Sequence, residues 1–196
     1  MAKIPANRPS GGVTVTWDEG TLALGDILDP GGNDFGSGTQ QVHVEMDQVG
    51  DLAILERHTS SRGNQVNFNN GERGDYFIQT DRSRDKLVLT FTPPVDAAVV
   101  QIAAMGIFAP VRYRAFVQAR FIGGALSQEK SITGTTVAAN GGAAFLGLQR
   151  SAAEAPIESL VFRVEPQQTA DVIRRFAVNQ VTALAASAVI AKRAGE

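Results

Sequence analysis

The feature that most constrains the fold is a strict period-two alternation between Val111 and Ile122. Apolar side chains occupy one set of alternate positions: Val111, Tyr113, Ala115, Val117, Ala119 and Phe121. The intervening positions carry Arg112, Arg114, Phe116, Gln118 and Arg120. On a helix the three arginines would scatter around the axis, whereas on a strand they line one face. The segment is therefore expected to be a strand with one buried face and one basic face.

Other short β-rich segments recur along the chain, separated by clusters of Gly, Asn and Ser. Further strands are expected at 13–17, 42–46, 52–56, 65–68, 75–79, 86–92, 97–105, 131–137, 143–148, 157–165 and 174–184. Pro93-Pro94 is expected to end one of them, because proline cannot donate to a ladder. A short helix is expected only in the Ala-rich segment Thr182–Arg193. This pattern predicts an all-β fold, an antiparallel sandwich.

The domain organisation that follows is simple. The chain of 196 residues is expected to fold as one β-sandwich over 13–185. A flexible N-terminal arm at 1–12, punctuated by Pro and Gly, would precede it, and a C-terminal tail at 186–196 would follow.

Composition excludes several classes of function. The 18 Lys and Arg against 20 Asp and Glu give a nucleic-acid partner no electrostatic support. The absence of cysteine excludes disulfides, thiolate nucleophiles and Cys-based metal sites. No apolar run is long enough for a membrane span, and the N-terminus lacks the apolar segment of a secretory signal, so a soluble chain is expected.

A family resemblance rests on the order of several short motifs. They are Leu87-Val-Leu-Thr-Phe-Thr-Pro-Pro-Val95, Phe145-Leu-Gly-Leu148, Ile157-Glu-Ser-Leu-Val-Phe-Arg-Val164 and Phe176-Ala-Val-Asn179. In this order the chain resembles bacterial jelly-roll modules that are similar to carbohydrate-binding and lectin-like domains, many of unassigned function. The resemblance implies a jelly-roll sandwich and a surface that binds glycans. Where that pattern often has Asp in the last strand, this chain has Asn179, which weakens the case for a structural calcium there.

The densest cluster of oxygen ligands lies in a Gly-rich segment and contains Asp26, Asp29, Asn33 and Asp34. Calcium takes six to eight oxygen ligands, which such a loop can present, so a calcium site is one interpretation. The alternative is a turn built by Asx residues and glycine, since Asp-Pro-Gly-Gly forms turns by itself.

A second candidate is the ridge formed by Arg112, Arg114 and Arg120. Its guanidinium groups suit a sugar acid, a phosphate or the carboxylates of a protein partner. Trp17 and Tyr76 are the aromatic candidates for stacking on sugar rings. The alternative is a solvated outer face paired with acidic residues of neighbouring strands.

Catalytic machinery is not recognisable in the sequence. The two histidines, His43 and His58, are expected to be solvated or hydrogen-bonded imidazoles, and the alternative is a His–His or His–carboxylate metal site. A hydrolase would need a carboxylate pair, for example Glu45 or Asp47 with Glu56, which nothing in the sequence brings together.

Two hypotheses for function remain open. In the first, the chain is a non-catalytic, lectin-like module that recognises a glycan or another surface ligand. In the second, it is a structural subunit of an extracellular or viral-type assembly, a homo-oligomer whose arm and tail contact neighbouring subunits. Both favour an extracellular or particle-associated location.

Overall fold

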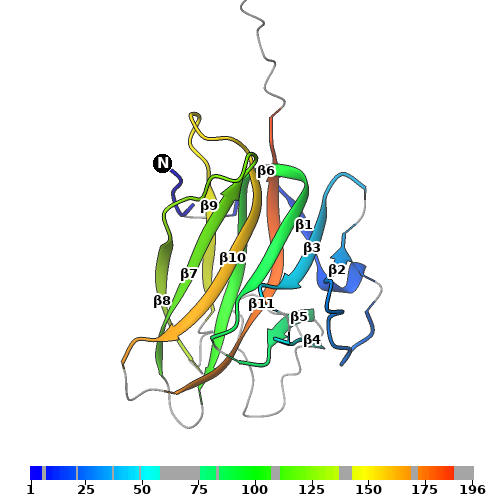
Figure 1. The fold of residues 1–196 in the computed structure, drawn as a ribbon, viewed down its shortest axis with the longest axis vertical. Coiled ribbons are helices and arrows are strands. Elements are labelled where there is room, and N and C mark those ends of the chain that lie inside the picture. Colours follow the sequence, from blue (N-terminus) through cyan, green and yellow to red (C-terminus); the bar gives the residue numbers. More distant parts are fainter. Residues whose placement is uncertain are drawn as a thin grey trace, which may run out of the picture.

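The computed structural model is an antiparallel β-sandwich of two layers (Figure 1). It describes residues 1–5, 8–20, 22–36, 38–48, 50–57, 76–82, 84–106, 111–136, 143–168 and 172–187. Within these ranges the only helical segment is the 3₁₀ turn η1 (Trp17–Glu19). The predicted all-β sandwich is confirmed. The expected strand at 65–68 lies outside the described residues.

The front layer is a six-stranded sheet seen face-on in Figure 1. Its order is β2 (Asn33–Phe35), β3 (Gln41–Met46), the first half of β6 (Leu87–Gly106), β10 (Ile157–Pro166), β7 (Arg112–Phe121) and β8 (Lys130–Thr135). All of these neighbours pair antiparallel; β2–β3 and β7–β8 are consecutive in the chain, whereas the central pairs β3–β6, β6–β10 and β10–β7 join strands far apart in the sequence. The front face is therefore assembled from distant segments.

The back layer lies behind it. Its order is β4 (Ala53–Arg57), β5 (Tyr76–Thr80), β11 (Ile173–Ala185), the second half of β6, and β9 (Ala144–Gln149). β1 (Val13–Val15) pairs with β11 further along the same edge that β5 uses. The expected helix is wrong at its start, because residues 182–185 belong to β11, and residues from 188 onward lie outside the described part.

β6 joins the two layers. The expectation that Pro93-Pro94 ends a strand is wrong, since β6 continues through both prolines as it passes from the front sheet to the back sheet. Its ladder partners change at this point: Thr92 pairs with β3, and Val95 already pairs with β10 and β11. The missing proline N–H groups therefore interrupt no ladder.

The core between the layers confirms the alternation of β7. Its predicted apolar face is buried, whereas Arg112, Arg114 and Arg120 are exposed on the front. Tyr113 is fully buried, and its hydroxyl donates to the Ile102 carbonyl at 3.0 Å. Burial raises the pKa of this phenol, so Tyr113 is a neutral core residue.

The outer face of the back layer is largely covered. Phe77, Ala103, Ala143 and Ala177 form a second buried apolar cluster there. The first residues of the chain run along the β9 edge, where Lys3 forms a two-way backbone bridge with Gln149. Ala2 is buried as well. The beginning of the expected flexible arm thus packs on its own sandwich.

Candidate functional site

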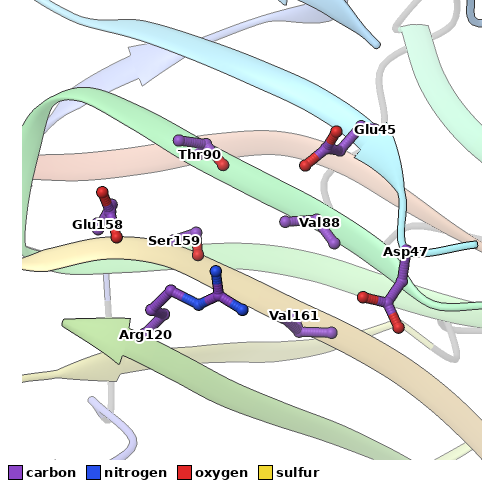
Figure 2. A pocket seen from close by; sticks show the side chains of 8 residues that line it. All are labelled: Glu45, Asp47, Val88, Thr90, Arg120, Glu158, Ser159 and Val161. Atoms are coloured by element: carbon purple, nitrogen blue, oxygen red, sulfur yellow. The ribbon is translucent and has the colours of Figure 1, made fainter. Parts of the chain in front are cut away.

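The front sheet carries an open polar pocket on its outer face. Its volume is about 240 Å³, and Figure 2 shows the side chains that line it: Glu45, Asp47, Val88, Thr90, Arg120, Glu158, Ser159 and Val161. They come from the ends or continuations of β3, β6, β10 and β7. The pocket is smaller than the roughly 300–1,000 Å³ of sites that enclose drug-sized ligands, so it suits a short stretch of a longer ligand.

Strand register explains why these side chains meet. Thr90 on β6 faces Ser159 on β10, which in turn faces Arg120 on β7. In the adjacent row, Glu45 on β3 faces Val88, and Val88 faces Val161. Residues paired in this way on one face lie about 5 Å apart. Two hydroxyls and two valines therefore form the floor, and charged side chains from β3 and β7 border it (Figure 2).

Most polar groups in the pocket lack a partner. Among the described residues, the side chains of Glu45, Glu158 and Arg120 form no hydrogen bond or ion pair. The Ser159 hydroxyl is also unpartnered there, although Ser159 is only 6% exposed. The Ser159 oxygen is not among the buried side-chain atoms without a partner, so it is open to the pocket, where water or a ligand can reach it. A free hydroxyl that lines a pocket marks a position where a ligand atom can bind.

Asp47 differs from the other pocket carboxylates. Lys86 lies beside it, with 3.3 Å between Nζ and the Asp47 carboxylate. Both side chains are substantially exposed, so this ion pair contributes at most about 1 kcal/mol. It neutralises one carboxylate at the margin of the pocket.

Arg163, two residues along β10 from the pocket residue Val161, already has partners within the fold. The Arg163 guanidinium stacks on the Phe116 ring at 3.8 Å from its centroid. It also donates two hydrogen bonds to Glu129, at 2.8 and 2.6 Å, and one to Glu165. Because Arg163 covers Phe116, this aromatic face is not available for stacking on a ligand.

The predicted arginine ridge is divided by the structure. Arg120 lines the pocket, whereas Arg112 and Arg114 are exposed further along β7 and do not line it. The ridge as a whole stays a prediction, and only its Arg120 end joins other candidate binding groups.

The predicted calcium ligands form hydrogen bonds within their own loop and to His43 on β3. Asp29 and Asn33 bond to each other through two hydrogen bonds, from the Asp29 N–H at 2.8 Å and from the Asn33 amide at 3.0 Å. Asp26 accepts from the Ala23 N–H, and Asp34 binds His43 Nδ1 at 2.8 Å. No three His, Asp or Glu side chains of the described ranges gather as a metal site. The calcium site stays a prediction, and the contacts match the turn interpretation.

The predicted stacking aromatics lie elsewhere. Trp17 is fully buried, packs edge-on against Phe35 at 5.2 Å and donates from Nε1 to the Val178 carbonyl. Its role as a surface platform is therefore wrong, because a large apolar ring is more stable in the core. Tyr76 is half-buried against the core and does not line the pocket.

Sequence reasoning missed half of the polar residues of this site. Thr90, Glu158 and Ser159 were not among the candidates, and Glu45 and Asp47 were named only as hypothetical hydrolase carboxylates. The available signal was the pair Glu158 and Ser159, two adjacent polar residues within the expected strand at 157–165. Its neighbours could not be found without the sheet order. The side chain of Glu56 lies outside the described part, so it cannot be placed near the pocket.

Comparisons with known proteins place the fold. No family model and no curated protein matches this sequence. A solved DUF4465 family protein from Bacteroides caccae has a TM-score of 0.53 at 10% identity, covering 89% of this chain and 99% of that one. The CBM22-1 xylan-binding domain of Paenibacillus barcinonensis Xyn10C has a TM-score of 0.41 at 17% identity, covering 85% and 100%. TmCBM61, solved in complex with β-1,4-galactotriose, has 0.38 at 10%, covering 74% and 88%.

The described residues contain no helix that is long and apolar enough to cross a membrane.

At sequence identities of 10–17%, the similarity to these solved structures concerns the fold alone. The first comparison shows that this chain has the β-sandwich fold of the DUF4465 protein over nearly its whole length.

Proposed function

We propose that this chain is a non-catalytic binding module that holds a saccharide in the front-face pocket. The observation that carries the proposal is the set of unpartnered polar groups that open into it, from Ser159, Arg120, Glu45 and Glu158. Each group is complementary to a sugar hydroxyl, since carboxylates accept two hydrogen bonds and guanidinium donates several.

The shape of the pocket agrees with this ligand class. It is open and lies across four strands, so an extended chain can enter and leave along the sheet. Val88 and Val161 give the floor two apolar contacts, which suit the C–H face of a sugar ring. With no open aromatic among the lining residues, affinity would depend on hydrogen bonds.

The absence of catalysis is part of the same proposal. The described histidine, His43, already has partners for both ring nitrogens: Nδ1 faces Asp34, and Nε2 faces the Gly31 carbonyl at 2.9 Å. It is therefore held as a structural donor to the loop rather than as a free general base.

A glycan array followed by calorimetry tests the proposal. Arg120→Ala is expected to weaken binding of an array hit tenfold or more, because hydrogen bonds from a charged group contribute about 1.5–3 kcal/mol. Ser159→Val, which fills the floor of the pocket, should also weaken it. Arg114→Ala is the matched control, an exposed arginine of the same strand that does not line the pocket.

Three results would contradict the proposal. One is an array without any saccharide hit. Another is a hit whose affinity is the same in Arg120→Ala and Arg114→Ala. A third is release of shortened products from the bound saccharide, which would refute the non-catalytic role.

A further inference from the structure

The charges around the pocket are unbalanced. Three carboxylates line it, from Glu45, Asp47 and Glu158, against one guanidinium, from Arg120. Lys86 offsets only Asp47. Glu45 and Glu158 therefore keep charges that no cation among the described residues neutralises by direct contact.

This imbalance discriminates between saccharides by charge. An ammonium group placed beside a carboxylate adds the attraction of opposite charges to the hydrogen bond, whereas a neutral hydroxyl or amide N–H forms the hydrogen bond alone. A sugar carboxylate would instead add like charge to a pocket that is already negative, which opposes binding. Arg120 alone cannot reverse this balance for a ligand with several acidic units.

The two free carboxylates also stand apart. Glu45 lies on β3 and Glu158 on β10, with β6 between them (Figure 2). Adjacent strands are about 4.8 Å apart, and Glu158 also lies three residues along β10 from Val161, the residue in the row of Glu45, so the backbones of the two glutamates are separated by roughly 14 Å. One amine cannot bind both, and each would take an amine of a different sugar unit.

We infer that the pocket selects oligosaccharides with free amino groups, such as glucosamine units, over N-acetylated or uronic-acid oligosaccharides. The inference rests on the proposed function and names its ligand class. Amines of separate units are expected to meet Glu45 and Glu158, while Arg120 and Ser159 bind hydroxyl or ring oxygens. For the Arg120 end of the arginine ridge, this inference replaces the hypothesis of a sugar-acid ligand with a preference for positively charged saccharides.

Calorimetry with three tetrasaccharides tests this selection at pH 6 and two salt concentrations. The probes are a fully deacetylated glucosamine tetramer, its N-acetylated counterpart and a galacturonate tetramer. The amine tetramer is expected to bind about tenfold tighter than the acetylated one, a difference of about 1.4 kcal/mol. The advantage should shrink at high salt, since the carboxylates are partly exposed. The galacturonate tetramer is expected to bind weakest.

Variants separate the pocket from the net charge of the chain. Glu45→Gln with Glu158→Gln should abolish the amine advantage while retaining binding of the acetylated tetramer. Glu19→Gln, an exposed carboxylate on η1 outside the pocket, is the control and should keep the advantage. Thermal unfolding of each variant verifies that it is folded.

The outcomes distinguish this inference from the proposed function. Equal affinity for the amine and acetylated tetramers, or tightest binding of galacturonate, overturns the charge selection and leaves saccharide binding standing. An amine advantage that survives in the double variant also overturns it. No binding of any tetramer, together with an empty array, overturns both.

Discussion

Two acidic regions of this molecule use their carboxylates in opposite ways. In the loop before and through β2, the side chains of Asp26, Asp29 and Asp34 are each bonded to a neighbour within the fold. In the front-face pocket, Glu45 and Glu158 are bonded to nothing among the described residues. The loop is the denser cluster in the sequence, yet its carboxylates already have partners within the fold.

The difference teaches where to look for a ligand. Hydrogen bonds made within the fold contribute to stability, so groups that make them are poor candidates for binding. Polar groups left unpartnered at a pocket gain their partners only from a ligand or water. Substitutions in the loop should therefore change stability, whereas substitutions in the pocket should change binding.

The largest effect is expected from Gly32→Ala in the loop. Gly32 has φ of +82°, and a Cβ there would contact the His43 ring and lie 2.7 Å from the Val44 carbonyl oxygen. Left-handed strain and this overlap should lower the free energy of unfolding by about 3 kcal/mol, measured by chemical denaturation. Gly25→Ala is the control, with φ of +86° but open space around its Cβ, and should cost about 1 kcal/mol. Equal losses would show that the loop does not pack on β3 as described.

Asn33→Ala should have the next largest effect. Asn33 is buried, and its amide both donates to and accepts from Asp29. Losing both bonds should cost about 2 kcal/mol of unfolding free energy. A loss of only a few tenths, within error of Asp18→Ala on the exposed part of η1, would contradict the structural role of this pair.

Glu154 gives a pH-dependent test of the comparison, and its expected effect on the free energy of unfolding is smaller. The pKa of this carboxyl lies below its usual value. The largest cause is the hydrogen bond from the Ser151 backbone N–H, and the Ser151 side chain, the Ala2 N–H and the nearby N-terminal charge lower it further. Its stabilisation is therefore present above the ordinary glutamate pKa and is lost as pH falls through the lowered pKa. The stability gap between the unmodified chain and Glu154→Gln should narrow on acidification in that window. A gap that is constant from neutral pH to pH 3 would refute the assignment.

The smallest effect on stability is expected in the pocket itself. Glu45→Gln with Glu158→Gln removes charges that make no internal bond, so unfolding free energy should change by about 0.5 kcal/mol or less. Denaturation of the double variant beside Asn33→Ala measures the contrast directly. A loss as large as that of Asn33→Ala would mean that these carboxylates are structural.

Much of the fold could be predicted because local patterns determine it. The alternation from Val111 to Phe121 predicted both faces of β7, and β3 likewise buries Val42 and Val44. β2 was missed because a three-residue strand carries no usable period. The continuation of β6 was missed because a strand can pass through prolines where their missing N–H groups interrupt no ladder; here that is the point where β6 changes sheets, a property of tertiary structure.

The site was harder to predict, and the reason is topological. Glu45, Thr90, Arg120 and Ser159 come from four strands that are up to 114 residues apart in the sequence, counted from 45 to 159. Only the β3-β6-β10-β7 order places them on one face. Residue types in the sequence instead suggested the Asp-rich loop as an ion site and Trp17 as a stacking platform. Both contribute to the fold, since Trp17 fills the core and the loop side chains bond to one another or to the backbone.

The central claim is that the pocket, and not the acidic loop, binds the ligand. The most direct test is to titrate ¹⁵N-labelled protein with the tightest-binding oligosaccharide and to follow backbone amide shifts. The account predicts the largest changes at Glu45, Thr90, Ser159 and Arg120, with little change from Asp26 to Asp34. Shifts confined to that loop or to the back sheet, or no shifts at saturating oligosaccharide, would contradict it.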